Sequence, residues 1–105
     1  MYTAKVFNDD GSVEIYFMEL KHWTEFDFLL DLIEKEHGCK VISNREMIYI
    51  RKAELVHNGI EFDLMHDDML GNFILAKNDS DGEVLKKLAD NVIESIKNKL
   101  RKLDL

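Results

Sequence analysis

Apolar and polar residues alternate along several short stretches of the chain, which is the pattern of strands that bury one face. Residues 12–18 show it clearly, because their odd-numbered positions are apolar: Val13, Ile15 and Phe17. The segment 3–8 lies just before them, and Asp9-Asp10-Gly11 between the two favours a turn. We therefore expect a first β-hairpin that pairs residues 3–8 with 12–18.

Two other segments repeat apolar residues every three or four positions, which indicates amphipathic helices. The first begins at the capping-box sequence Thr24-Glu25-Phe26-Asp27 and stops at His37-Gly38. The second begins at the similar sequence Ser80-Asp81-Gly82-Glu83 and runs for about five turns. The expected buried stripes are Phe26, Leu29, Leu30 and Ile33 in the first helix and Leu85, Leu88, Val92, Ile96, Leu100 and Leu103 in the second.

Asn58-Gly59 is the clearest local signal, because a two-residue type I′ turn needs positive φ at both positions and Asn-Gly tolerates this best. Such a turn fixes the register of its two arms. Its pairs are Leu55 with Phe62, Ala53 with Leu64, Val56 with Glu61, Glu54 with Asp63, and Lys52 with Met65. Ala53, Leu55, Ile60, Phe62 and Leu64 then share one side as core, and the acids of this hairpin lie on the other side.

The remaining strands are less sharply marked. Val41 and Ile42 predict a short strand, Ser43-Asn44-Arg45 a turn, and residues 47–57 a longer strand. A turn near His66-Asp67-Asp68 then leads to a last strand over 70–77. The predicted order is ββαββββα in one α+β domain, residues 1–105, whose two helices pack on one face of an antiparallel sheet as a two-layer sandwich.

The net charge of −7 lies in one stretch of the sequence. Residues 53–83 hold eight acids and one base, which gives 1 − 8 = −7, while residues 1–52 and 84–105 contribute −3 and +3. A negative potential of this kind attracts cationic partners and repels nucleic acid. The chain lacks a signal peptide, an apolar run long enough to span a membrane, and a second cysteine beside Cys39, so we expect a cytoplasmic protein that contacts neither nucleic acid nor membrane.

Register and charge together predict a contact surface for a cationic protein. Its acids would surround apolar side chains that include methionine, which adapts to the shape of a partner. The alternative is a solvated sheet face whose acids only keep the protein soluble. The residues assigned to this partner-binding surface are Glu54, Val56, Glu61, Asp63, Met65, His66, Asp67 and Asp68, with Met69 as a further apolar contact.

Metal binding and catalysis find little support in the sequence. His57 and His66 lie at opposite ends of their hairpin, so they cannot share an ion. No phosphate-binding loop, nucleophile elbow or paired-cysteine motif occurs, and Cys39 reads as a small core residue. Trp23 is expected to pack the start of the first helix onto the core, although an exposed Trp23 would be a contact site instead. We expect no cofactor, no metal and no enzymatic activity.

The second half of the chain resembles small bacterial immunity proteins of polymorphic toxin systems. The resemblance rests on residues 59–68, on Gly71-Asn72-Phe73-Ile74 and on residues 80–88, that is, on a strand, an acidic turn, a strand and a long helix. It implies a short acidic protein that binds and neutralises a cognate toxin domain, frequently a cationic nuclease. The alternative function is that of a small acidic homodimer, similar to secretion chaperones, that binds a segment of an effector.

Overall fold

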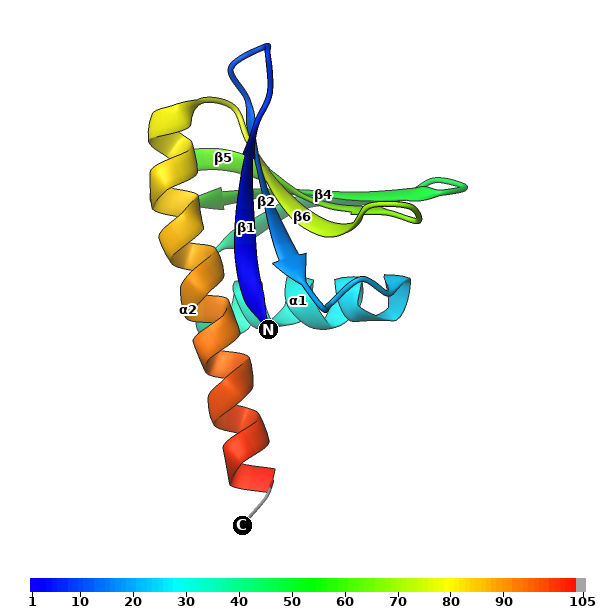
Figure 1. The fold of residues 1–105 in the computed structure, drawn as a ribbon, viewed down its shortest axis with the longest axis vertical. Helices are drawn as coiled ribbons and strands as arrows, with labels where there is room; N and C mark the ends of the chain where they lie inside the picture. The colour runs from blue at the N-terminus through cyan, green and yellow to red at the C-terminus, as the bar shows by residue number, and fades with distance from the viewer. Residues whose placement is uncertain (104–105) are drawn as a thin grey trace.

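The computed structural model describes residues 1–103 and has the predicted order ββαββββα. It confirms an α+β fold with one six-stranded antiparallel sheet and two helices (Figure 1). The elements are β1 (Tyr2–Phe7), β2 (Val13–Met18), α1 (Trp23–Glu36), β3 (Lys40–Glu46), β4 (Ile50–His57), β5 (Ile60–Asp67), β6 (Gly71–Ala76) and α2 (Asp79–Leu103).

The strands lie in the order β1-β2-β6-β5-β4-β3, so the last strand in the sequence is in the middle of the sheet. β6 pairs with β2 on one side and with β5 on the other. The first hairpin is thereby joined to the β3–β4–β5 meander only through β6. β1 and β3 form the two edges of the sheet.

Both helices cover the same face of the sheet (Figure 1). α1 packs against β5 and β6, while α2 packs against β1, β2 and β6. The core fills the space between the two layers, and on the strands it consists of alternate residues, as the sequence pattern predicted. These residues are Val13, Ile15, Phe17, Ala53, Leu55, Phe62, Leu64, Ile74 and Ala76. We call this the helix-covered face and the opposite side the open face.

Each helix begins a residue or more before the capping sequence that we had assigned to it. α1 begins at Trp23, and the carboxylate of Glu25, not of Asp27, accepts the backbone N–H of His22 at 3.2 Å. α2 begins at Asp79, and the side-chain Oδ1 of Asn78 accepts the N–H of Asp81 at 2.8 Å. The predicted N-caps Thr24 and Ser80 are therefore wrong. In both helices the cap lies two residues earlier, and at α2 the Asn78 side chain satisfies a free N–H group of the first turn.

The turn between β3 and β4 also differs from the prediction. β3 continues through Ser43-Asn44-Arg45 to Glu46, and the chain reverses at Met47–Tyr49 instead. The N–H of Met47 donates to the carbonyl of Ile50 at 2.8 Å and closes this turn. A shift in register between Val41 and Ser43 marks a bulge at the exposed edge of the sheet. The apolar residues expected to begin a strand are thus in a turn.

α2 runs beyond the edge of the sheet, at the lower end of Figure 1. Leu85, Leu88, Val92 and Ile96 of its stripe are buried, as predicted, whereas Leu100 and Leu103 are exposed. Within residues 1–103, neither helix is both long enough and apolar enough to cross a membrane.

Candidate functional site

The hairpin of β4 and β5 has the register that Asn58-Gly59 predicted. Both turn residues have positive φ, 50° for Asn58 and 80° for Gly59. Each predicted pair is present, including Glu54 opposite Asp63 and Val56 opposite Glu61. The side chains of Glu54, Val56, Glu61, Asp63 and Met65 consequently share the open face.

Two rows of residues cross the open face side by side. One is a carboxylate row, in which the register aligns Ser43, Glu54, Asp63, Leu75 and Glu14 on β3, β4, β5, β6 and β2. The next row along the strands is mainly apolar and aligns Lys52, Met65, Phe73 and Tyr16. Acids and apolar side chains therefore lie next to each other over four strands, although only β4 and β5 had been assigned to this surface.

Lysines and a hydroxyl group contact the central acids. The Lys77 ammonium is 2.8 Å from Glu61, and this ion pair lowers the pKa of the Glu61 carboxyl through its hydrogen bond and its charge. The Lys52 ammonium lies 3.8 Å from Asp63, and the Ser43 hydroxyl donates to Glu54 at 2.9 Å. The open face is therefore less negative than its acids alone suggest.

Asp63 remains the least satisfied of these acids. Burial raises its pKa, and the neighbouring charge of Glu54 acts in the same direction, whereas Lys52 only partly offsets both. Asp63 and Glu54 line a shallow hollow of about 320 Å³ with Ile42, Val56 and the two lysines. A cationic group placed in this hollow would stabilise two carboxylates that now face each other.

The apolar row is partly shielded. The rings of Tyr16 and Phe73 are tilted against each other with their centroids 4.9 Å apart, and Phe73 is buried although it lies on the open face. The Tyr16 hydroxyl donates to Glu14 at 3.1 Å, and burial, chiefly, raises the pKa of Tyr16 to about 12. Tyr16 therefore stays a neutral donor that ties the apolar row to the carboxylate row.

Two of the assigned residues lie off this surface, and the carboxylate of a third is engaged in a turn. His66 and Asp68 lie on the helix-covered side of the sheet, where His66 is buried among other side chains. Asp67 lies at the end of the open face, but its carboxylate accepts the N–H groups of Met69 and Leu70 and so closes the β5–β6 turn. The alternation of β5 contained the signal for His66, because the even-numbered positions Phe62 and Leu64 already pointed inward.

His66 belongs to a buried hydrogen-bond network. The side-chain amide of Asn72 donates to the carbonyls of Leu20 and His22 at 2.8 and 3.0 Å, which fixes its oxygen as the acceptor for His66 Nδ1 at 2.9 Å. His66 Nε2 contacts the Asp68 carboxylate at 3.0 Å. This network connects β5, β6 and the segment that leads into α1.

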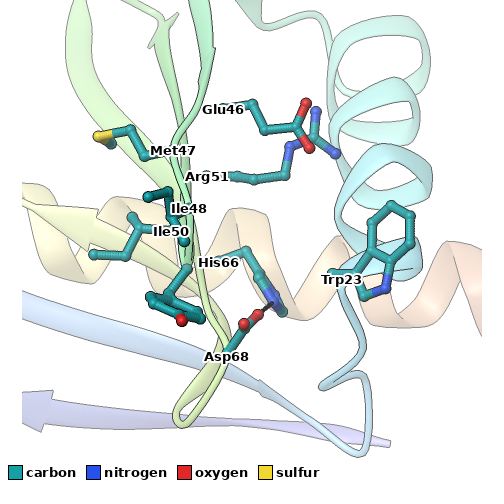
Figure 2. A pocket seen from close by; sticks show the side chains of 9 residues that line it. Trp23, Glu46, Met47, Ile48, Ile50, Arg51, His66 and Asp68 are labelled. Atoms are coloured by element: carbon teal, nitrogen blue, oxygen red, sulfur yellow. Dashed lines mark hydrogen bonds and ion pairs between the residues drawn. The ribbon is translucent and has the colours of Figure 1, made fainter.

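A second candidate surface lies beside that network. Trp23, Arg51, His66 and Asp68 line a pocket of about 240 Å³ together with the β3–β4 turn (Figure 2). In the figure Trp23 lies on the α1 side, while Met47, Ile48 and Ile50 lie on the other side of the strands. Arg51 stacks over the ring of Phe26 and pairs with Asp27 at 2.9 Å. Trp23 is exposed, so it does not pack onto the core as expected.

The acidic stretch of the sequence is divided among three places. Glu54, Glu61 and Asp63 lie on the open face, and Asp67 and Asp68 lie at the β5–β6 turn. Asp79 and Asp81 occupy the first turn of α2, where their negative charge interacts favourably with the helix dipole, and Glu83 follows directly after that turn. Only the first group is placed to form a continuous acidic surface.

Cys39 has a histidine neighbour, because its Sγ is 3.5 Å from Nδ1 of His57. Cysteine–histidine pairs can act as nucleophiles, but this thiol is buried, and burial raises its pKa to about 11. A protonated, covered thiol is a poor nucleophile, so we assign Cys39 to the core. Among residues 1–103, no group of three or more His, Cys, Asp or Glu side chains is arranged to hold a metal ion.

Comparisons with protein-family models, with curated proteins and with solved structures found no match for this chain. Its function is therefore inferred from the chemistry of its own surfaces.

Proposed function

We propose that the protein binds a cationic protein domain through the open face of its sheet and neutralises it, in the manner of a toxin immunity protein. The single observation that carries this proposal is the pairing of Glu54 with Asp63 on a sheet face that no element of residues 1–103 covers. The proposal assigns the protein a binding function without catalysis.

The carboxylates support a basic partner. Asp63 and Glu54 face each other across two strands, and burial already disfavours the charged form of Asp63. A lysine or arginine from a partner would reach both groups and form hydrogen bonds stronger than those between neutral groups. Lys52 would then be the residue that a partner displaces, since its ammonium is 3.8 Å away, at the long end of ion-pair distances.

The apolar row supports a protein partner in particular. Interfaces combine a buried apolar centre with a polar rim, and aromatic residues and methionine are enriched in that centre. Met65, Phe73 and Tyr16 form such a centre beside the carboxylates. Val6 and Tyr2 on the edge strand β1 extend the apolar surface and are exposed.

The test is a binding and toxicity assay with the C-terminal domain encoded by the neighbouring gene. We expect that domain to be toxic when it is expressed alone and harmless when this chain is co-expressed. Calorimetry of the purified pair at increasing salt should show weaker binding as salt rises. The double variant Glu54→Gln/Asp63→Asn should reduce affinity by about tenfold or more, since it removes charges at the centre of the interface.

A matched control variant has the same net charge as Glu54→Gln/Asp63→Asn. Glu34 on α1 and Glu83 on α2 are exposed acids of the helical layer, so Glu34→Gln/Glu83→Gln removes two charges away from the open face. This control should bind like the unmodified protein. Equal affinity of both double variants would rule out the open face as the contact. A stable homodimer that instead binds extended peptides would favour the chaperone-like function.

A further inference from the structure

One end of the sheet carries a cluster of exposed apolar side chains. The β3–β4 turn contributes Met47, Ile48 and Tyr49, the β5–β6 turn contributes Met69, and the start of α1 contributes Trp23. We call these five residues the apolar tip. The pocket of Figure 2 is lined by Trp23 and by the three residues of the β3–β4 turn. A second pocket, of about 440 Å³, is lined by Tyr49 and Met69 together with Ile50, Asp67 and Asp68.

The exposed area of the apolar tip is large for a protein of this size. Trp23, Met47, Ile48, Tyr49 and Met69 are 57, 50, 88, 69 and 94% exposed. At about 200 Å² for each side chain, the four residues of the two turns expose roughly 600 Å² between them, which equals the upper end of the range for the largest apolar patch of a typical monomer, about 300–600 Å². Trp23 lies across the strands from them, on the α1 side. One side of a standard protein interface buries about 800 Å². The apolar tip is therefore of the size of a binding site.

The residues of the apolar tip are also unusual for the places they occupy. Hairpin turns normally carry Gly, Asn, Asp or Ser, and the sequence Met-Ile-Tyr provides none of them. Methionine and aromatic residues form contact surfaces that adapt to different partners. Their presence in a turn costs solubility without supporting the core, so a function outside the core explains them better.

The charges around the apolar tip select the partner. The two pockets are lined by the acids Glu46, Asp67 and Asp68. The basic side chains among their lining residues are Arg51, whose guanidinium already pairs with Asp27, and His66, which contacts Asp68. A partner that combines apolar and positively charged side chains would match this arrangement. A second copy of the chain would bring the same acids against it, and an anionic lipid surface would be repelled.

We propose that the apolar tip binds a cationic amphipathic helix of a protein partner. A helix satisfies its own backbone hydrogen bonds and binds through side chains alone. This suits the apolar tip, which consists of two turns and a helix start and presents no continuous strand edge for a β-partner. The apolar side of the helix would cover Ile48 and Met69, and its lysines or arginines would lie near Glu46 and Asp68. This site lies at one end of the open face, beyond the apolar row, and goes beyond the function proposed above.

The protein contains its own reporter for this interaction. Trp23 is the only tryptophan of the chain and is part of the apolar tip. The probe is a synthetic amphipathic helix of leucine and lysine without tryptophan, titrated into the full chain. We expect a saturable blue shift of the Trp23 emission that weakens with added salt. A peptide of the same pattern with glutamate in place of lysine should give no shift.

Variants locate the binding site on the protein. Ile48→Asn/Met69→Asn removes the two most exposed side chains of the apolar tip and should lower the affinity for the leucine-lysine peptide by about tenfold or more. Leu100→Asn/Leu103→Asn removes two exposed leucines at the far end of α2 and should leave the affinity unchanged. Glu54→Gln/Asp63→Asn on the open face should also leave it unchanged, which separates this site from the one proposed above.

Several results would overturn the proposal. They are an equal response to the glutamate peptide, an affinity unaffected by Ile48→Asn/Met69→Asn, and the absence of any shift. Two further results would assign the apolar tip to a different occupant and so also contradict the proposal. One is a blue shift with vesicles of phosphatidylcholine and phosphatidylglycerol, and the other is a blue shift that grows with protein concentration alone.

Discussion

The two ends of β4 close hairpins in opposite ways. At one end the turn is Asn58-Gly59, whose residues suit the positive φ angles that they adopt. At the other end the turn is Met47–Tyr49, whose residues suit a strand or a core and are nevertheless exposed. The first turn is explained by local geometry alone. The second is not, and a residue type that disagrees with its position points to a role in binding.

The comparison separates residues that stabilise the fold from residues that are available to a partner. The polar turn sets the register that places Glu54 opposite Asp63, so it acts on the open face through the backbone. The apolar turn is joined to the β5–β6 turn, because the carbonyl of Tyr49 accepts the N–H of Asp68 at 3.2 Å, while its own side chains extend into solvent. Substitutions at the two ends should therefore affect different properties.

The largest effect is expected at Asn72, in the buried network with His66. Asn72→Ala removes two donated hydrogen bonds and one accepted bond, and it leaves the carbonyls of Leu20 and His22 and a ring nitrogen of His66 without these partners. We expect the free energy of unfolding to fall by about 2–4 kcal/mol, measured by urea denaturation. Asn44→Ala on exposed β3 is the control and should cost far less. A loss below about 1 kcal/mol at Asn72 would show that this network contributes little to the stability of the fold.

An intermediate effect is expected at the polar turn. Gly59 has φ of 80°, which a residue with a Cβ atom adopts only at a cost, and the space around it is open. Gly59→Ala should therefore lower the free energy of unfolding by about 1–2 kcal/mol through backbone strain alone. Thr24→Ala, at an exposed position of α1, should change it by less than about 0.5 kcal/mol. An unchanged stability of Gly59→Ala would mean that the turn tolerates another geometry.

The smallest effect on stability is expected at the apolar turn itself. Ile48→Asn should change the free energy of unfolding by less than about 0.5 kcal/mol, because the side chain of Ile48 is largely in solvent. The same variant should bind less of a hydrophobic dye, measured by dye fluorescence. Ile15→Asn, in the core, makes the same chemical change and should strongly destabilise the fold. A large loss of stability in Ile48→Asn would contradict the view that this residue is free to bind a partner.

The sequence predicted what depends on neighbouring residues. Alternation and the Asn-Gly turn fixed which residues of β4 and β5 face the core and which face outward, and the helical stripes identified both helices. The helix starts were misplaced because the Ser/Thr-x-x-Glu/Asp pattern fitted Thr24 and Ser80, while Glu25 and Asn78 supplied the bonds. A pattern shows a plausible cap, but geometry decides between competing side chains.

The remainder of the site depends on contacts between distant parts of the chain. Tyr16 meets Phe73 only because β2 pairs with β6, and Ser43 reaches Glu54 only because β3 continues through the expected turn. Lys77 follows β6 and neutralises Glu61 on β5. The sequence therefore predicted the acids of the open face but not the groups that reduce their charge. Met69, and Trp23 if exposed, were predicted as contacts, but the rest of the apolar tip was missed because Met47–Tyr49 reads as the beginning of a strand.

The central position of β6 has a consequence for how the chain folds during synthesis. A ribosome releases β1, β2, α1, β3, β4 and β5 before β6, yet the first hairpin can join the others only after β6 has been made. Until then the first hairpin and the β3–β4–β5 meander are not paired with each other, and their exposed strand edges favour misfolding and aggregation. The pairing of β6 with β2 also bridges a long separation along the chain, which slows folding. The six-stranded sheet can therefore form only after β6 has been synthesised and has paired with both β2 and β5.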